Sequence, residues 1–160
     1  MIRKRKRKTL TNHKKVIILT QPKAESWRFF GIRFSNGTQP LDDWFRDDLS
    51  DAAQFALIDA LKDAQKIDDP RNWLCFKRHL KGKYKKRRIW ELWFSCGDNR
   101  EYRLLGIFGS GRKQAIFLMG CYHKGSVYTP TEALDSAFKR AGDLAEKRAT
   151  IYERKIPTDR

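Results

Sequence analysis

The order of hydrophobic and polar positions predicts strands and two helices in the first part of the chain. Residues 27–34, WRFFGIRF, alternate as a half-buried strand does, and the apolar run 16–20 indicates a shorter strand ahead of it. Apolar residues at helical spacing then predict a helix over about 41–49 and a second helix, capped by Ser50, that continues to about Lys66. We expect these two helices to form an antiparallel helical hairpin.

The middle of the chain has the pattern of an antiparallel sheet. A short strand is expected at 74–77, and residues 89–96 and 101–108 are typical of a hairpin because a turn sequence, GDNR, separates them. The strand 113–122 is apolar for most of its length. This composition predicts a strand in the centre of the sheet, covered on both faces.

The last predicted element is a helix. It begins after a capping box, Thr129-Pro130-Thr131-Glu132, and extends to about Arg154 with apolar residues along one face. The fold class expected from this order is α+β, a small, mainly antiparallel sheet with an N-terminal helical hairpin and a C-terminal helix. We expect one domain over 16–155, preceded by a basic arm, 1–15, and followed by a tail, 156–160.

Charge is concentrated in two short windows. The chain has a formal net charge of +16, and residues 1–15 and 77–88 each contain eight Lys or Arg and no acid. A basic excess of this kind indicates a polyanionic partner. RNA or DNA is favoured over lipid, because neither window has bulky apolar residues opposite its charges. The alternatives are a solubilising tail or nuclear-localisation signal for 1–15 and a solubilising loop for 77–88.

Several classes of protein are not supported by the sequence. No apolar run approaches the roughly 18 residues of a membrane helix, and the apolar stretch 16–19 is too short for a signal peptide. The three cysteines include no CxxC pair, so neither a disulfide framework nor a zinc site is indicated. HExxH, GxSxG and a phosphate-binding Gly-rich loop are absent. We therefore predict a cytoplasmic protein without metal or cofactor.

Candidate chemistry gathers where the last predicted strand leads into the last helix. His123, Lys124 and Tyr128 follow the strand, and free backbone amides at a helix N-terminus attract phosphate. Imidazole and phenol groups transfer protons, and lysine adds a fixed positive charge. Arg103 alternates onto the face opposite the core and is predicted to join this site. The alternative is a solvated loop with one surface histidine.

Five segments in fixed order resemble a known family. They are LKG, IWELWF, EYRLLGIF, AIFLMGCYHKG and TPTEALDSAFKRA, which together cover about residues 75–150. The chain resembles the HigB/RelE-type toxins of bacterial type II toxin–antitoxin systems (RelE/ParE superfamily), and in particular their phage-associated branch. The resemblance implies a compact sheet flanked by helices, whose basic concave face binds mRNA on the ribosome and cleaves it without metal. In that reaction the 2′-hydroxyl attacks the adjacent phosphate and the 5′-oxygen leaves.

The resemblance also implies roles for individual residues. His123 is expected to act as general base or acid, and Tyr128 to transfer a proton or stack on a base. Arg103, Lys124 and Lys81 are expected to hold and neutralise the phosphate. The RNA-binding residues expected in the basic window are Lys77, Arg78, His79, Lys81, Lys85, Lys86, Arg87 and Arg88. The sequence departs from the family pattern at Trp93, where W-E-L-R has arginine, and at 123–130, which carry fewer cations than K-K-T-x-K-T-P.

Two other functions remain open. The first is a non-catalytic nucleic-acid- or ribosome-binding protein of the same fold, and the second is a ParE-like inhibitor of gyrase. A cognate antitoxin, expected to be a small helix-turn-helix protein, is implied for a toxin of either kind. The basic arm 1–15 is expected to contact ribosomal RNA or DNA.

Overall fold

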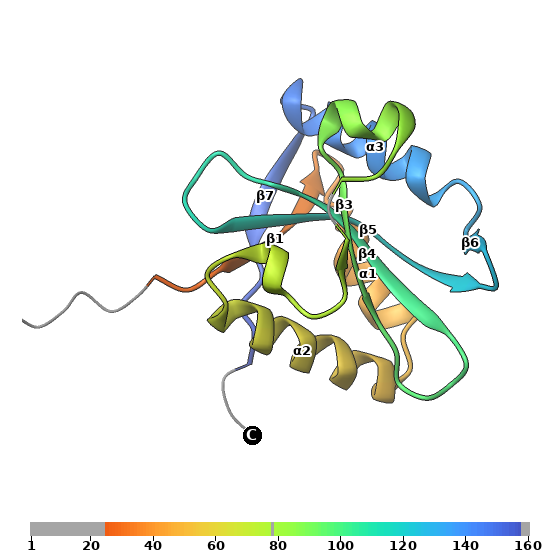
Figure 1. Ribbon diagram of the computed structural model, residues 1–160. Coiled ribbons are helices and arrows are strands. Elements are labelled where there is room, and N and C mark those ends of the chain that lie inside the picture. The colour runs from red at the N-terminus through yellow and green to blue at the C-terminus, as the bar shows by residue number, and fades with distance from the viewer. Residues whose placement is uncertain (1–24, 78, 158–160) are drawn as a thin grey trace, which may run out of the picture.

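A computed structural model describes residues 25–77 and 79–157. These residues form a mixed sheet with helices on both of its faces (Figure 1). In chain order the elements are β1 (Arg28–Phe34), α1 (Pro40–Asp47), α2 (Asp51–Lys66), the 3-10 helix η1 (Pro70–Asn72), β2 (Phe76–Lys77), the 3-10 helix η2 (Gly82–Arg87), β3 (Trp90–Phe94), β4 (Glu101–Phe108), β5 (Gln114–Lys124), β6 (Val127–Thr129), α3 (Ala133–Ala145) and β7 (Ala149–Glu153).

The sheet has seven strands in the order β2-β3-β4-β5-β1-β7, with β6 paired to β5. β1 runs parallel to β5, and the other pairs are antiparallel. The expected α+β class with a mainly antiparallel sheet is therefore confirmed. β5 lies in the interior of the sheet, as its apolar sequence predicted, because β4 and β1 flank it.

Each face of the sheet carries its own apolar core. The core beneath α1 and α2 is rich in aromatic residues, among them Phe29, Trp73 and Trp90. On the opposite face, Ala133, Ala137 and Ala141 of α3 pack on β1, β4 and β5 side chains. Figure 1 shows α3 and η2 above the sheet and α2 below it. α3 can lie close to the strands because small residues recur along its inner side.

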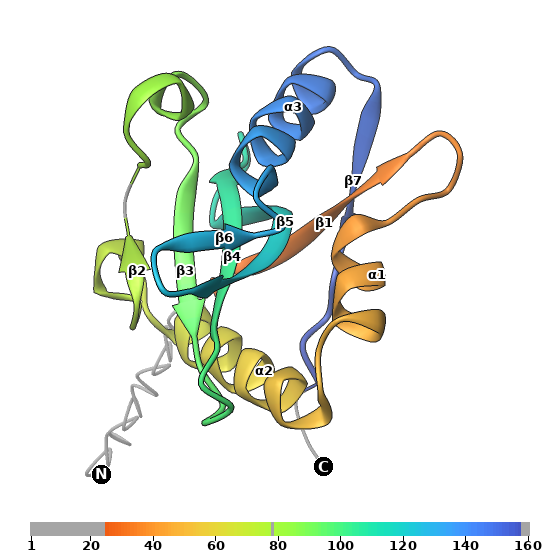
Figure 2. The same ribbon diagram turned by 90° about the vertical axis from the view of Figure 1, so that its right-hand side faces the viewer.

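The N-terminal helices form where the sequence places them. Ser50 caps α2, since its hydroxyl oxygen accepts a hydrogen bond from the Ala53 amide at 3.3 Å. The two helices are consecutive, as expected, but Figure 2 shows their axes crossing at a wide angle rather than lying antiparallel. The reason is that α1 packs on β1 and β5 while α2 reaches β3, so each helix follows the sheet instead of its neighbour.

The C-terminal part of the chain corrects the expected long helix. α3 ends at Ala145, and the residues from Ala149 to Glu153 form β7 instead of continuing the helix to Arg154. The chain reverses at Lys147, whose φ is +59°, and β7 then pairs along the outer edge of β1. Pairing with that edge satisfies backbone groups that a longer helix would have left without partners.

The expected capping box at the start of α3 is also wrong. Thr129 is the last residue of β6, so it lies in a strand and not at the helix N-terminus; the Thr129–Pro130 peptide bond is cis. The N-cap is Glu132, which makes no side-chain capping hydrogen bond.

Parts of the predicted organisation lie outside the described residues, namely the arm 1–15 and the strand 16–20. Ile156, which was assigned to the tail, is partly buried against the aromatic core. Within the described ranges, no helix combines the length and apolar character needed to cross a membrane.

The contact between α1 and β5 depends on a glycine. A Cβ at Gly120 would overlap the indole ring of Trp44, which lies directly on the backbone of β5. We expect Gly120→Ala to lower the free energy of unfolding by about 1–3 kcal/mol, because neither the ring nor the strand can move without repacking. Chemical denaturation measures the change. In the control Gly142→Ala, the new methyl group meets only the mobile end of Arg87, so stability should be unchanged or raised by up to about 1 kcal/mol.

Candidate functional site

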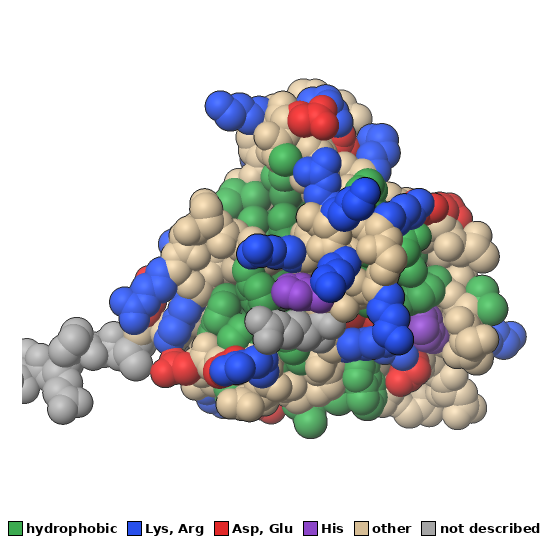
Figure 3. Space-filling view, turned by 45° about the horizontal axis from the view of Figure 1, so that its top comes forward, with side chains coloured by type: hydrophobic (Ala, Val, Ile, Leu, Met, Phe, Trp, Pro, Cys, Tyr) green, Lys and Arg blue, Asp and Glu red, His purple; other side chains and the backbone are tan. Residues whose placement is uncertain are grey.

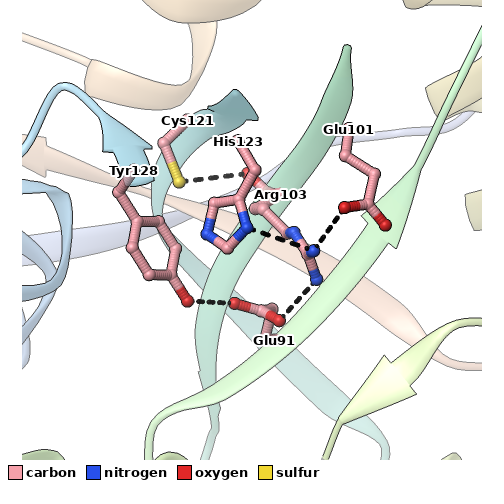
Figure 4. Close-up of polar contacts among 6 residues, drawn as sticks. All are labelled: Glu91, Glu101, Arg103, Cys121, His123 and Tyr128. Atoms are coloured by element: carbon pink, nitrogen blue, oxygen red, sulfur yellow. Dashed lines mark hydrogen bonds and ion pairs between the residues drawn. The ribbon is translucent and has the colours of Figure 1, made fainter. Parts of the chain in front are cut away.

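Polar side chains from four strands meet on the sheet face that α3 covers (Figure 4). Alternate residues of a strand point to the same face, so Arg103 and His123 share the side of Leu105 and Cys121, which pack against α3. The sheet register brings them together, because Glu101 lies opposite His123 and His123 lies opposite Tyr128. We call this group the strand-end cluster; it consists of Glu91, Glu101, Arg103, His123 and Tyr128.

Arg103 is the centre of the strand-end cluster. Its Nη1 lies 2.7 Å from Glu91 Oε1, and its Nη2 lies 2.8 Å from Glu101 Oε2. The Glu91 side chain is only 1% exposed and that of Arg103 11%, whereas that of Glu101 is 44% exposed. The two carboxylates compensate the buried guanidinium charge, which would otherwise be costly away from water.

Tyr128 forms a hydrogen bond with the buried carboxylate of Glu91. Its hydroxyl donates a hydrogen bond to Glu91 Oε2 at 2.5 Å. Burial and the neighbouring Glu91 carboxylate raise the pKa of Tyr128, so the phenol stays protonated and remains a donor at neutral pH.

His123 is held from both sides. Arg103 Nη2 donates to His123 Nδ1 at 3.3 Å, and the ring stands edge-on to that of Tyr128 with 4.0 Å between the centroids. Burial, with the positive charge of Arg103 as the next cause, lowers the pKa of His123 below its usual 6.5. The imidazole is therefore neutral at pH 7. Since a guanidinium only donates, Nδ1 must be the acceptor and Nε2 must carry the proton.

The free N–H of His123 defines what the cluster can do. Nε2 is buried and has no hydrogen-bond partner among the described residues. A buried donor without a partner is costly, and it is a position from which an incoming oxygen can gain a hydrogen bond. The strand-end cluster thus offers a neutral imidazole N–H, a guanidinium and a half-exposed carboxylate within one site.

The predicted basic window lies next to this site on the same side of the molecule. Lys77 of β2 is near enough for its charge to contribute to the lowered pKa of His123. Lys124 is the exposed last residue of β5, and Lys81 is the exposed N-cap of η2. Figure 3 shows Lys and Arg side chains gathered around histidine side chains on this face.

The basic segment η2 is fixed in place by α3. Lys83 forms an ion pair with Asp135 at 2.6 Å, and the Tyr84 hydroxyl donates to the same carboxylate at 2.8 Å. Arg87 lies over the Phe138 ring, 5.6 Å from its centroid. The remaining predicted RNA-binding residues of this segment, Lys85, Lys86 and Arg88, are exposed.

Two of the predicted RNA-binding residues need separate mention. His79 is half-buried between β2 and η2, with a φ of +37°. Arg78 lies outside the described residues. The structure thus brings Arg103, His123 and Tyr128 together and places Lys77 near His123, whereas the η2 residues lie against α3.

Sequence reasoning missed the two carboxylates. The signal for Glu91 was its place between Trp90 and Leu92 in an otherwise apolar strand, since a charge in such a strand requires a partner. The predicted hairpin of 89–96 and 101–108 could also have placed Glu91 near Arg103. Its register places Trp93 opposite Arg103, and Glu91 is two residues from Trp93 on the same face.

The described residues form neither a group of metal ligands nor a reactive thiol next to the strand-end cluster. No three of their His, Cys, Asp or Glu side chains are grouped as ligands for a metal ion. Cys121 adjoins the strand-end cluster, where its thiol donates to the Arg103 carbonyl at 3.8 Å. Burial raises the pKa of Cys121 to about 12, so the thiol is not a nucleophile at neutral pH.

Comparison with models of known families, with curated proteins and with solved structures finds no match to this chain.

Proposed function

We propose that the protein is a metal-independent endoribonuclease, the toxin of a type II toxin–antitoxin system that cleaves mRNA on the ribosome. The observation that carries the proposal is the neutral imidazole of His123, which is oriented by Arg103 with an unpartnered N–H and is bordered by basic side chains. The resemblance to HigB/RelE-type toxins agrees with this chemistry, and so does the arrangement of a sheet between helices.

Transesterification of RNA requires a base for the 2′-hydroxyl and positive groups for the phosphoryl oxygens. Glu101 is the half-exposed carboxylate of the strand-end cluster and is proposed to take the 2′-hydroxyl proton. Arg103 and the Nε2–H of His123 stabilise the charge that develops on the phosphoryl oxygens. The 2′-oxygen bonds to phosphorus, the bond to the 5′-oxygen breaks, and that oxygen takes a proton from water.

The basic residues around the site bind the RNA backbone. Lys77 and Lys124 lie beside His123, and η2 extends the positive surface along α3. Contacts of this kind are not specific for sequence. Their number makes binding steeply dependent on salt, with a loss of roughly a thousandfold or more between 50 and 200 mM for six or more phosphate contacts.

A second candidate is a non-catalytic RNA-binding protein with the same basic surface. The observation in its favour is that two carboxylates already neutralise Arg103 and that Nε2 of His123 is buried. In that case the strand-end cluster is a structural ion-pair network, and the exposed lysines and arginines alone contact RNA.

Incubation of the purified protein with mRNA in magnesium buffer, with and without ribosomes, separates the two candidates. The nuclease is expected to produce new RNA ends that carry 2′,3′-cyclic phosphate, and only with ribosomes. Salt-sensitive RNA binding without any cleavage would support the second candidate. Absence of both binding and cleavage would contradict both proposals.

A further inference from the structure

The sheet opens between β1 and β5, and a pocket lies beside the opening. β1 pairs with β5 only over Arg28–Phe30 and Gln114–Ile116. Both strands continue beyond these residues, and Figure 2 shows them diverging. Along the part of β5 that β1 has left, residues of α1, β5 and α3 enclose a pocket of about 300 Å³. This volume is at the lower end of the range for small-molecule sites.

Arg140 of α3 brings a guanidinium group to this pocket. Its Nη1 donates to the Leu118 carbonyl at 2.8 Å, whereas its Nε and Nη2 have no partner among the described residues. Asp143, one turn further along α3, is already paired with Lys139 and Arg148. Burial lowers the pKa of Arg140, but a guanidinium keeps its proton at neutral pH. Arg140 is therefore a half-buried charge whose cost an anionic ligand would relieve.

Asp48 places the opposite charge on the exposed side of the pocket. Its carboxylate forms no ion pair with the part of the chain that the structure describes. Asp43 and Asp47, which also line the pocket, are both paired with Arg46. Carboxylates repel phosphate, so these three acids make the pocket unsuitable for an RNA backbone. A ligand that satisfies both Arg140 and Asp48 has to carry a negative and a positive group.

The positions of the two charges determine how far apart those groups must be. Arg140 belongs to α3, and Asp48 follows α1, and these helices pack on opposite faces of the sheet. The two charges therefore approach the pocket from opposite sides. A ligand can reach both only if several bonds separate its charged groups.

We propose that this pocket binds a basic residue with a free α-carboxylate, which places the carboxylate on Arg140 and the side-chain cation on Asp48. A carboxylate accepts two parallel hydrogen bonds from a guanidinium. The aliphatic part of a lysine or arginine side chain packs on apolar surface, which Pro40, Trp44 and Pro130 supply here. Free arginine or lysine has these groups, and so has a polypeptide whose last residue is basic.

An NMR titration of the ¹⁵N-labelled full-length protein with L-arginine tests the proposal. The amide signals of Met119 and Gly120, which line the pocket, are expected to shift in a saturable way. L-argininamide lacks the carboxylate and should bind at least about tenfold more weakly, the usual loss for one charged hydrogen bond. L-citrulline has an uncharged side chain and should bind about 2- to 5-fold more weakly, as expected for an exposed ion pair.

A peptide with a C-terminal arginine, Gly-Gly-Arg, distinguishes the two sources of the ligand. Tighter binding of the peptide than of L-arginine would identify the C-terminus of a protein as the occupant. Tighter binding of L-arginine would identify the free amino acid. Either result supports the proposed chemistry, provided that the amidated peptide binds more weakly than the free acid.

Variants at the two charges assign the contacts. Asp48→Asn should weaken L-arginine binding about 2- to 5-fold and leave L-citrulline binding unchanged, because only the charged side chain interacts with Asp48. Arg140→Leu should remove the preference for L-arginine over L-argininamide. Asp59→Asn alters an exposed carboxylate of α2 outside the pocket and should have no effect. Thermal melting shows whether Arg140→Leu is folded, and the exposed Asp48 gives a test that does not depend on it.

Three results would overturn the inference. They are no saturable shift of the Gly120 signal up to roughly 10 mM L-arginine, at which even a millimolar site is mostly occupied, equal affinity for L-arginine and L-argininamide, and an unchanged affinity of Asp48→Asn for L-arginine. The inference does not rest on the proposed function. The pocket has no lining residue in common with the strand-end cluster, and the titration contains no RNA.

Discussion

Replacing Glu91 by alanine is expected to lower the free energy of unfolding by about 3 kcal/mol or more, because it leaves a buried guanidinium without its closest counter-charge. The Glu91 side chain is almost fully buried and contacts Arg103 through one oxygen and Tyr128 through the other. The alanine variant therefore loses an ion pair and leaves the Tyr128 hydroxyl without its acceptor. Urea denaturation of wild type and variant measures the difference.

Two comparisons isolate the buried pair. Glu101→Ala removes the other carboxylate of Arg103, but this side chain is 44% exposed, so the cost should be within about 1 kcal/mol. The double variant Glu91→Leu, Arg103→Met removes both buried charges and should recover most of the lost stability. Equal effects of Glu91→Ala and Glu101→Ala would show that burial does not govern the strength of these pairs.

The His123→Ala variant is expected to cleave RNA about 100- to 1,000-fold more slowly, the usual cost of removing one hydrogen-bond donor to a transition-state oxyanion. RNA affinity should change little, because the exposed lysines and arginines remain. Single-turnover cleavage of ribosome-bound mRNA measures the rate, and anisotropy measures the affinity. His79→Ala, which removes the other described histidine on the basic face, is the matched control.

The His123→Gln variant distinguishes a donor from a base. A glutamine amide can accept from Arg103 and donate to a phosphoryl oxygen, but it cannot take up a proton. If His123 acts as a donor, the glutamine variant should retain a rate within about tenfold of wild type, well above that of alanine. Rates as low as those of His123→Ala would show instead that proton transfer by the imidazole is required.

The pH dependence of cleavage follows from the same assignment. Burial and the charge of Arg103 lower the pKa of His123, so the midpoint of its protonation in the folded protein lies below the usual value of 6.5. Protonation leaves the Nε2–H in place but adds a proton to Nδ1, so the imidazole can no longer accept from Arg103. The orientation that this hydrogen bond gives the ring is therefore lost as the pH falls through the lowered pKa. The wild-type rate should therefore stay constant from pH 7.5 to about 6.5 and decrease below that, as far as His123 controls it.

The elements that local sequence determines were predicted closely. β4 has the bounds expected from its alternation, and α2 begins after Ser50 because the serine side chain caps the first turn. β7 was missed for a physical reason. Its five residues carry no signal strong enough to oppose the helical spacing that precedes them, and they form a strand because the edge of β1, more than a hundred residues earlier in the chain, is available for pairing.

In the candidate site, too, some features follow from the local sequence and others only from the tertiary fold. Arg103 was predicted to alternate onto the face opposite the core and to join the site of His123. The structure brings the two together, but on a face that carries an apolar core of its own. Glu101 lies two residues from Arg103 on the same face of β4, and Glu91 reaches Arg103 through the register of β3 with β4. These ion pairs were not predicted, because strand alternation gives the face of a side chain but not its partner. The proton position on His123 depends in turn on Arg103 as its neighbour.

The pairing of β1 has a consequence for synthesis of the protein. β1 is the first described strand, yet both of its partners, β5 and β7, come from the second half of the chain. As the polypeptide leaves the ribosome, β1 and the helices after it cannot pack until those strands have been synthesised. Until then, the aromatic residues of β1 and these helices stay exposed to chaperones. Nascent chains that stop before β7 should therefore remain sensitive to protease at β1, whereas chains released after β7 acquire resistance.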